Sequence, residues 1–339
     1  MPTLWRRFAG ALLFVAALAV SRQAGAQAWQ KADPSKAGWS IGKLEAAKSY
    51  SISLDPTAVM IVQDGKIIAD WGDISHKVDV ASVRKSLLSA LYGIAVSEER
   101  IDLSTTLAEL DIDDTPPSLT AIEKTATVRD LLMARSGVYH PAAYETDDIR
   151  RNRPARGSHA PGTFWFYNNW DFNVLGTIYQ RQTGEDIFES FENRIARPIG
   201  MEDFSARDGR YVFEELSQYP AYPFHLSARD AARFGQLFLN GGRWADRQIV
   251  PASWIRESTN DYSLIRHGEQ GYGYMWWLLP SDVWGPNAAY AAGSGGQYIA
   301  FVPSKRLVVV QTVDLDQNPE GIRTSSFIDF LKQVVAAAP

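Results

Sequence analysis

Short runs of apolar and β-branched residues at the two ends of the sequence constrain the fold most strongly. Residues 58–72 (AVMIVQDGKIIADWG) contain two such runs joined by Asp64-Gly65, a dipeptide typical of a β-hairpin turn. From about residue 271 onward four more runs follow, with Gly, Pro or Ser-Lys between them: YGYMWWLLP, AAYAAGSGG, QYIAFVP and RLVVVQTVD. We predict that these late runs form an antiparallel meander and share one sheet with the N-terminal hairpin.

The sequence between the two strand regions is predicted to be mainly helix and loop. Residues 127–137 and 227–242 each begin with Ser or Thr, which cap helix N-termini, and each end in glycine, which commonly terminates helices. Two further helices are expected near residues 35–51 and 323–337. The predicted fold class is therefore α+β, with an antiparallel sheet flanked by helices and a mostly helical second region. A cleft between two such regions is a common location for a ligand site.

The length and composition are those of a globular chain with a large core. The chain has 339 residues, of which 45% are hydrophobic and 22% charged. We predict a single domain at 27–339, with a sheet region at about 40–80 and 260–339 and a helical region at about 82–258. The net charge of −5 argues against nucleic acid as a partner. The absence of cysteine excludes cysteine nucleophiles and thiolate metal sites.

The N-terminus has the pattern of a secretory signal peptide. Arg6 and Arg7 precede an apolar run at 9–20, and small residues that fit a cleavage site follow it. An uncleaved membrane anchor is the alternative, but a run of about a dozen residues is short for a membrane span. We therefore predict a signal peptide at 1–26 and an exported mature chain, periplasmic or secreted, without a stable membrane span.

The first candidate for catalysis is the serine–lysine pair Ser82 and Lys85, within DVASVRKSLLSALYGIAV (79–96). On a helix, a spacing of three residues brings two side chains within about 5–6 Å at Cβ. Small residues flank this pair on the helical wheel, where a solvated face would carry long polar side chains, so we expect Lys85 to be half buried. Burial lowers the pKa of an amine and turns it into a base. In the alternative interpretation, Ser82 only caps the helix and Lys85 lies on the surface.

A second candidate segment is APGTFWFYNNWDFNVLG (160–176), which carries Tyr167 and Asn169 after a Pro-Gly turn. A phenol can transfer protons, and an amide can both donate and accept hydrogen bonds. Several aromatic residues flank Tyr167, so the alternative is that it is an ordinary core side chain.

A third candidate segment is AAGSGGQYIAF (291–301), in which three glycines interrupt a strand pattern. Glycine within a strand often marks a close approach of the backbone to a ligand. The exposed N–H groups there, together with that of Ser82, could form an oxyanion hole. The alternative is a bulge or bend in the sheet, which is the commoner use of such glycines.

In this order, the three segments resemble those of the serine β-lactamase and penicillin-binding-protein superfamily, over roughly residues 40–335. SVRK matches its S-x-x-K motif, YNN matches its Y-x-N motif, and PGTFWFYNNWDFNVLG is similar to a run in its class C-like esterase and amidase branch. The resemblance implies an acyl-enzyme on Ser82, with Lys85 as the base. It also implies that Tyr167 protonates the leaving group and activates water, after the Lys85 cation has lowered the pKa of the phenol.

The third segment departs from the superfamily pattern. The β-lactam-binding members carry K-T-G, but here the strand reads Ser294-Gly295-Gly296, so the lysine that helps to hold a β-lactam carboxylate is missing. This departure argues against β-lactam turnover. GSGGQ is instead similar to the amidases and esterases related to 6-aminohexanoate-oligomer hydrolase.

The resemblance also implies roles for residues around the serine. The N–H of Gln297 joins that of Ser82 in holding the oxyanion, Ser294 and Gly296 contact the substrate, and Asn169 holds Lys85 or the acyl amide of the substrate. We therefore predict hydrolysis of carboxylic esters or linear amides of small molecules, without a metal or cofactor. The alternatives are a β-lactamase or D-amino-acid peptidase of the same fold, or a non-catalytic peptidoglycan-binding module. The oligomeric state is not predicted.

Two other hydrolase classes lack their motifs in this sequence. A Ser-His-Asp hydrolase needs G-x-S-x-G, and a zinc hydrolase commonly carries H-E-x-x-H. The charged segment 140–160 is expected to be either a lid over the cleft, with Asp147 and Asp148 facing a cationic substrate end, or a solvated loop with internal ion pairs. Aromatic residues of the late strands could line an acyl pocket or belong to the core: Tyr274, Trp276 and Trp277.

Overall fold

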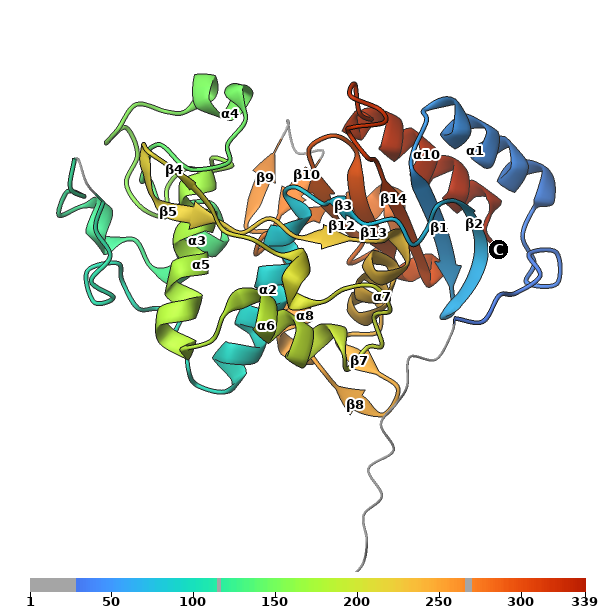
Figure 1. Ribbon diagram of the computed structural model, residues 1–339, viewed down its shortest axis with the longest axis horizontal. Helices are drawn as coiled ribbons and strands as arrows, with labels where there is room; N and C mark the ends of the chain where they lie inside the picture. The colour runs from blue at the N-terminus through green and yellow to red at the C-terminus, as the bar shows by residue number, and fades with distance from the viewer. Residues whose placement is uncertain (1–28, 115–116, 266–269) are drawn as a thin grey trace, which may run out of the picture.

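An eight-stranded antiparallel sheet forms the centre of the protein in the computed structural model, which describes residues 29–114, 117–265 and 270–339 (Figure 1). The strand order is β2-β1-β14-β13-β12-β11-β10-β9. The predicted sharing of one sheet by the first hairpin and the late strands is confirmed, because β1 pairs with β14. The strands are β1 (Ala58–Gln63), β2 (Lys66–Gly72), β9 (Ser263–Ile265), β10 (Gln270–Tyr272), β11 (Trp277–Leu278), β12 (Ala289–Gly293), β13 (Gln297–Val302) and β14 (Leu307–Thr312).

Most of the helices lie in the sequence between β2 and β9, as predicted, and one helix lies near each end of the described chain. The helices are α1 (Ile41–Ser53), α2 (Val83–Ser97), α3 (Val128–Leu132), α4 (Asp147–Asn152), α5 (Asn169–Thr183), α6 (Ile187–Phe191), α7 (Ala228–Leu239), α8 (Ala252–Ser258), α9 (Ser281–Trp284) and α10 (Thr324–Ala337). Short strand pairs connect them: β3 (Val78–Asp79) with β6 (His225–Leu226), β4 (Val212–Glu214) with β5 (Ser217–Ala221), and β7 (Arg243–Trp244) with β8 (Arg247–Gln248).

The central strands are buried on both faces, because helices cover both sides of the sheet (Figure 1). In β1, Val59 and Ile61 belong to the core that includes α1 and α10. The alternate residues Met60 and Val62 belong to the larger core, which includes α2, α5 and α7. Two-sided burial explains why these strands appear in the sequence as continuous apolar runs rather than as an alternating pattern. Helix α7, from the middle of the chain, also packs on this sheet against β14, β13 and β1.

Local turn chemistry agrees with the sequence at the first hairpin and differs from it in the late strands. Asp64 and Gly65 adopt φ values of 53° and 71°, the left-handed conformation of a tight hairpin turn. The run YGYMWWLLP forms two short strands, β10 and β11, rather than one. Met275 has a φ of 62°, and the chain reverses there.

The predicted starts of α3 and α7 are confirmed, whereas the predicted end of α3 is wrong. Ser227 caps α7 by accepting a hydrogen bond from a backbone N–H, and Thr127 caps α3 in the same way. However, α3 ends at Leu132 and not at Gly137. The left-handed conformation that follows this helix is adopted by Ala134, with a φ of 56°, and alanine gives no stop signal in a sequence.

The predicted signal peptide at 1–26 lies outside the described residues. Within the described ranges, none of the helices combines the length and apolar character that a membrane span requires. Export therefore stays a prediction from the sequence.

Candidate active site

A sharp turn between β3 and α2 positions Ser82. Ala81 has a left-handed φ of 47°, and its N–H donates a hydrogen bond to Oδ1 of Asp79 at 2.8 Å. Ser82 follows at the N-terminal end of α2, where it makes no side-chain cap hydrogen bond. Its Oγ instead accepts a hydrogen bond from Nζ of Lys85 at 2.7 Å. The structure thus contradicts the alternative in which Ser82 serves only as a helix cap.

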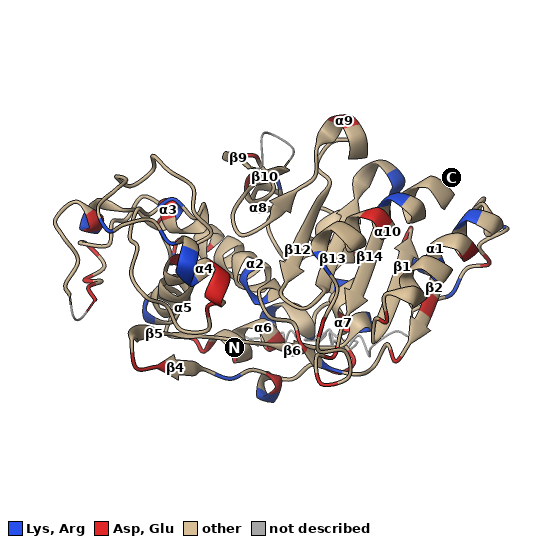
Figure 2. Cartoon of the chain, turned by 90° about the horizontal axis from the view of Figure 1, so that it is seen from above, with Lys and Arg blue, Asp and Glu red and all other residues tan. Residues whose placement is uncertain are grey.

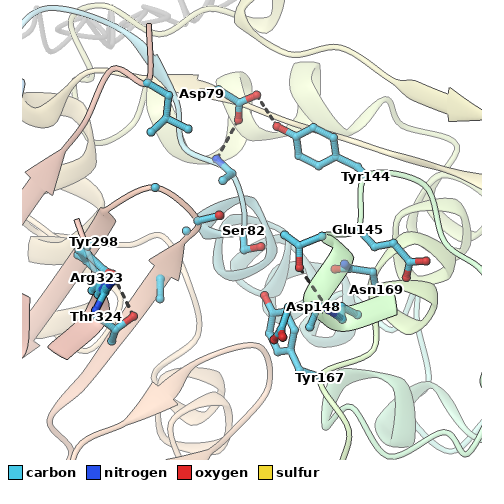
Figure 3. A pocket seen from close by; sticks show the side chains of 18 of the residues that line it. Asp79, Ser82, Tyr144, Glu145, Asp148, Tyr167, Asn169, Tyr298, Arg323 and Thr324 are labelled. Carbon is cyan, nitrogen blue, oxygen red and sulfur yellow. Dashed lines mark hydrogen bonds between the residues drawn. The ribbon is translucent and has the colours of Figure 1, made fainter. Parts of the chain in front are cut away.

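Lys85 joins Ser82 to Tyr167, a residue from a distant part of the sequence. Its Nζ lies 2.7 Å from Ser82 Oγ and 2.8 Å from the Tyr167 hydroxyl. The amine also lies 4.9 Å from the centre of the Phe172 ring. Lys85 is 2% exposed, so it is fully buried rather than half buried as expected. In Figure 3 the hydroxyls of Ser82 and Tyr167 face the same space.

Burial sets the protonation states of Lys85 and Tyr167. It lowers the pKa of Lys85 well below its usual range, and the neighbouring Arg84 guanidinium lowers it further. Burial also raises the pKa of Tyr167 to about 12, against the opposing effects of a hydrogen bond with Ser82 and of Arg84. The expectation that a Lys85 cation lowers the Tyr167 pKa is therefore wrong, because the interior disfavours both the ammonium and the phenolate. Burial thus shifts Lys85 toward the free amine, and it keeps Tyr167 a phenol near neutral pH.

Ser82 and Tyr167 open onto a cavity of about 780 Å³ between the helical region and the sheet. Among the described residues that line it, one cationic side chain, Arg323, stands against five carboxylates. These are Asp79, Glu145, Asp148, Glu214 and Glu320. Within the described ranges, we find no group of three or more His, Asp or Glu side chains placed to hold a metal ion.

Asn169 lies on the cavity wall as the first residue of α5. Its side chain is 4% exposed, and its Oδ1 accepts no hydrogen bond from the described residues. Among the described residues, no hydrogen bond joins Asn169 to Lys85, so the predicted hydrogen bond between the two is not present there. Contact of Asn169 with a substrate stays a prediction.

The end of β12 approaches the serine turn closely. A Cβ on Gly293 would lie 2.3 Å from the carbonyl oxygen of Val80, so only glycine permits this approach. The predicted substrate residue Ser294 is exposed and lines the cavity, together with Ala292 and Gly295. The glycine-rich segment therefore forms part of the cavity wall on the sheet side, where Figure 3 shows Tyr298, Arg323 and Thr324.

Two predicted residues of the same segment do not line the cavity. Gly296 and Gln297 are buried behind its wall, where Gln297 pairs with Gly293 across β12 and β13. The Gln297 side chain donates to the carbonyl of Val313 at 2.7 Å and accepts from its N–H at 3.0 Å. Gln297 thus fastens β13 to the end of β14. In this segment the cavity is lined by residues 292–295, and the role of the Gln297 backbone N–H stays a prediction.

The charged segment 140–160 contains α4 and forms a side wall of the cavity. Glu145 and Asp148 line the cavity, whereas Asp147 points away and lies 3.3 Å from Arg150. Glu145 is buried against Arg153. The segment therefore has the internal ion pairs expected of a solvated loop and the contact with the cleft expected of a lid. Figure 2 shows acidic and basic positions side by side on α4. Lid motion stays a prediction.

Of the three late aromatic residues, only Trp277 lines the cavity. Its ring stacks on that of Tyr167, with centroids 5.5 Å apart and an interplanar angle of 25°. Tyr274 and Trp276 are buried in the core. Trp277 therefore packs against the Tyr167 ring and offers an apolar surface to a ligand.

Several cavity residues were missed in the sequence, among them Asp79 and Tyr144. Asp79 accepts the Ala81 N–H and also a hydrogen bond from the Tyr144 hydroxyl at 2.6 Å, so it ties the serine turn to the wall that carries α4. An aspartate two residues before a turn N–H is a known turn signal and could have been found. Tyr144 gave no such signal, since its contact depends on tertiary packing.

A family model described as Beta-lactamase matches residues 54–329. Among solved structures, the fold is similar to a Bacillus anthracis protein assigned as a 6-aminohexanoate-dimer hydrolase, with a TM-score of 0.65, 23% identity, and coverage of 86% of this chain and 82% of that one. It is also similar to a class C β-lactamase, with a TM-score of 0.62, 15% identity, and coverage of 87% and 95%. At these identities the likeness shows the fold alone.

Curated relatives match a shorter stretch. A D-aminopeptidase of Brucella anthropi is 26% identical over 188 residues, which are 48% of this chain and 35% of the relative. The esterase EstB of Burkholderia gladioli is 27% identical over 152 residues, which are 45% of this chain and 30% of the relative. The matched stretch thus spans about a third of the length of these relatives.

Proposed function

The chain belongs to the Beta-lactamase family, and from this premise we propose that it is a serine hydrolase that forms an acyl-enzyme on Ser82. One observation carries the proposal: the buried Lys85 amine lies within hydrogen-bond distance of both the Ser82 and Tyr167 hydroxyls, at the floor of a cavity. A nucleophile next to its base is the arrangement that covalent catalysis requires. The proposed substrates are carboxylic esters or linear amides.

In the proposed acylation, Ser82 Oγ bonds to the carbonyl carbon and its proton passes to the Lys85 amine. The carbonyl oxygen becomes an oxyanion. When the C–O or C–N bond breaks, the leaving atom takes the phenol proton of Tyr167, and the Lys85 ammonium replaces that proton. The amine is neutral again at the end of this step, as it was at the start. The raised pKa of Tyr167 supports this relay, because a phenol rather than a phenolate has a proton to donate.

Two helix N-termini support stabilisation of the oxyanion. Ser82 lies at the start of α2, where backbone N–H groups lack intrahelical partners and the helix dipole favours negative charge. Asn169 opens α5 on the same cavity. A second donor is proposed at the glycine-rich wall, from the backbone N–H of Gln297, which pairs with Gly293 at the end of β12. One such donor is typically worth about 3–4 kcal/mol in the transition state.

In the proposed deacylation, a water oxygen bonds to the acyl carbon. The Tyr167 hydroxyl takes a proton from this water and passes its own proton to Lys85. Lys85 then returns a proton to Ser82 Oγ as the acyl carbon–oxygen bond breaks. The products are a carboxylic acid and the free serine, and no group outside the three side chains is needed to balance the protons.

The charge of the cavity supports ester or amide substrates over β-lactams. β-Lactams carry a carboxylate, and the lining residues include five carboxylates and, of the described cations, only Arg323. The glycine-rich wall places Ser294 in the cavity, with no lysine in that segment. The curated relatives are named as an esterase and a D-aminopeptidase, so peptides of D-amino acids belong in the same substrate panel.

The test compares Ser82→Ala with Ser89→Ala. Ser89 lies two turns further along α2, buried and with no hydrogen-bond partner for its hydroxyl among the described residues. The panel contains short and long p-nitrophenyl esters, linear amides, D-amino-acid peptides and nitrocefin. We expect Ser82→Ala to lose turnover of the preferred substrate by about three orders of magnitude or more, and Ser89→Ala to retain it. Unchanged turnover by folded Ser82→Ala refutes the mechanism, and nitrocefin turnover at the ester rate refutes the substrate assignment.

A further inference from the structure

Arg84 lies between Ser82 and Lys85 in the sequence, yet the proposed chemistry does not use it. Its side chain is 0% exposed, which is rare for a guanidinium. The group stacks on the Tyr222 ring, with the central carbon 4.3 Å from the ring centre, and lies 5.9 Å from the Tyr144 ring. A charged side chain is therefore enclosed next to the site.

No carboxylate pairs with Arg84 among the described residues. Its Nη2 donates to Oδ1 of Asn173 at 3.1 Å, and its Nε and Nη1 have no acceptor in the described part of the chain. Asn173 is neutral, and its own amide donates to the carbonyl of Ala143 at 3.0 Å. The carboxylate of Asp79, which also contacts Tyr144, accepts hydrogen bonds from the Tyr144 hydroxyl and the Ala81 N–H and lies 3.7 Å from Arg210.

This arrangement carries an energetic cost that packing alone does not explain. A guanidinium keeps its proton at any physiological pH, and a buried charge without a counter-ion is expensive. An apolar side chain of similar volume would fill the same space at lower cost. An aspartate at position 173 would give Arg84 a counter-ion, but the chain has an amide there. The result is a buried guanidinium charge with no paired carboxylate among the described residues.

The groups in contact with the Lys85 amine carry no formal charge. Tyr167 and Phe172 face the amine from the start of α5, and Ser82 faces it from its own helix. Behind them, burial raises the pKa values of Tyr272 on β10, Tyr222 in the segment before β6, and Asp171 on α5. Each of these shifts favours the neutral form.

We infer that Arg84 is a positioning residue whose buried charge keeps the Lys85 amine unprotonated, in the form that takes the Ser82 proton. The inference rests on the proposed function and adds the residue that prepares its base. The positive charge of Arg84 disfavours protonation of the Lys85 amine to an ammonium. Burial of the amine also lowers its pKa. Arg84 thus acts through Lys85 and does not touch the substrate cavity.

The experiment measures the pH dependence of kcat/KM for a p-nitrophenyl ester in the wild type and in Arg84→Met. Activity requires the free amine, so it rises with pH through the pKa of Lys85. Removal of the neighbouring charge raises that pKa, and we expect the rising limb to move up by about one pH unit or more, with about a tenfold loss of activity below it. If Arg84 had only a structural role, Arg84→Met would lower kcat/KM at every pH but would not change the pH at which kcat/KM rises.

A second pair of variants leaves Arg84 in place. Asn173→Asp gives it a counter-ion, and we expect the limb to move up as in Arg84→Met. Asn173→Ala removes the same amide without adding charge, so its limb should stay at the wild-type position. If Arg84→Met does not fold, as judged by its thermal unfolding, this pair still decides the question.

A limb that stays in place in both Arg84→Met and Asn173→Asp overturns the inference about Arg84. That result leaves the proposed function intact, provided that Ser82→Ala is inactive. Activity in Ser82→Ala, in contrast, refutes the proposed function whatever the limb does. The two failures are therefore distinguishable in one set of proteins.

Discussion

At the scale of single residues, the buried amine of Lys85 serves the proposed chemistry but lowers the stability of the folded protein. Its amine is buried with two hydroxyl groups as hydrogen-bond partners, Ser82 and Tyr167. The unfolded chain holds a proton at this lysine up to about pH 10.4, whereas the folded protein releases it at a much lower pH. At any pH between these two pKa values, folding must therefore expel a proton, and this lowers the free energy of unfolding.

We predict that Lys85→Met is inactive but more stable than the wild type at pH 7, by about 0.5–2 kcal/mol in the free energy of unfolding. Methionine fills similar space without the cost of removing a proton. The difference should shrink as the pH rises toward 10, because the unfolded wild type then loses its proton as well. Urea denaturation of both proteins at pH 7, 8.5 and 10 checks this prediction. A stability difference that is independent of pH would show that the amine is not buried as a free base.

At this scale, the sequence predicted the residues that helix geometry brings together. The spacing of Ser82 and Lys85 places them on one helix face whatever the rest of the fold does. The pKa of Tyr167 could not be predicted in the same way, because its direction depends on burial by distant segments. The position of Gln297 and the isolation of Arg84 likewise depend on neighbours that are remote in the sequence.

Strand β12 and the serine turn illustrate the scale of secondary-structure elements. The strand can approach the turn because Gly293 has no side chain where the carbonyl of Val80 lies. This contact sets the distance between the glycine-rich wall and Ser82, and hence the width of the cavity at the nucleophile.

We predict that Gly293→Ala destabilises the protein by about 1–3 kcal/mol, because the added methyl group forces β12 and the turn apart. The same displacement should lower kcat/KM by roughly tenfold or more, since small misplacements of reacting groups are costly. Gly42→Ala is the matched control, because a Cβ at Gly42 in α1 meets no atom within 4 Å. It should keep full activity and gain up to about 1 kcal/mol of helix stability. Wild-type kinetics in Gly293→Ala would contradict this account of the glycine.

The elements themselves were predictable where one local signal dominated. The hairpin turn at Asp64-Gly65 and the caps Thr127 and Ser227 are such cases. The end of α3 and the split of YGYMWWLLP into two strands were not, because Ala134 and Met275 adopt left-handed conformations that their side chains disfavour. Tertiary contacts override local preference at these two positions.

At the scale of the whole molecule, the cavity collects charge from segments far apart in the chain. Asp148 comes from α4 on the helical side, whereas Glu320 precedes α10 on the sheet side. These carboxylates surround the path to Ser82 and should repel anionic substrates over several ångströms, less so at high salt. The sequence showed the charged segment 140–160, but not which of its acids face the cavity.

We predict that Asp148→Asn raises kcat/KM a few-fold for an anionic ester or nitrocefin and leaves a neutral ester almost unchanged, because one repulsive charge is removed. The matched control is Asp147→Asn, since Asp147 is adjacent but does not line the cavity. The gain should fade in about 0.5 M salt, where exposed charges are screened. An equal gain in both variants would show that net charge, rather than the cavity wall, controls the selectivity.

The most direct test of the central claim is to trap the acyl-enzyme. The protein is incubated with a fluorophosphonate or a slowly hydrolysed p-nitrophenyl ester, digested, and analysed by mass spectrometry. We expect one adduct, on the peptide that contains Ser82, and no adduct in Ser82→Ala. An adduct on another residue would contradict the assignment of Ser82 as the nucleophile. Substrate turnover by the Ser82→Ala variant would contradict it as well.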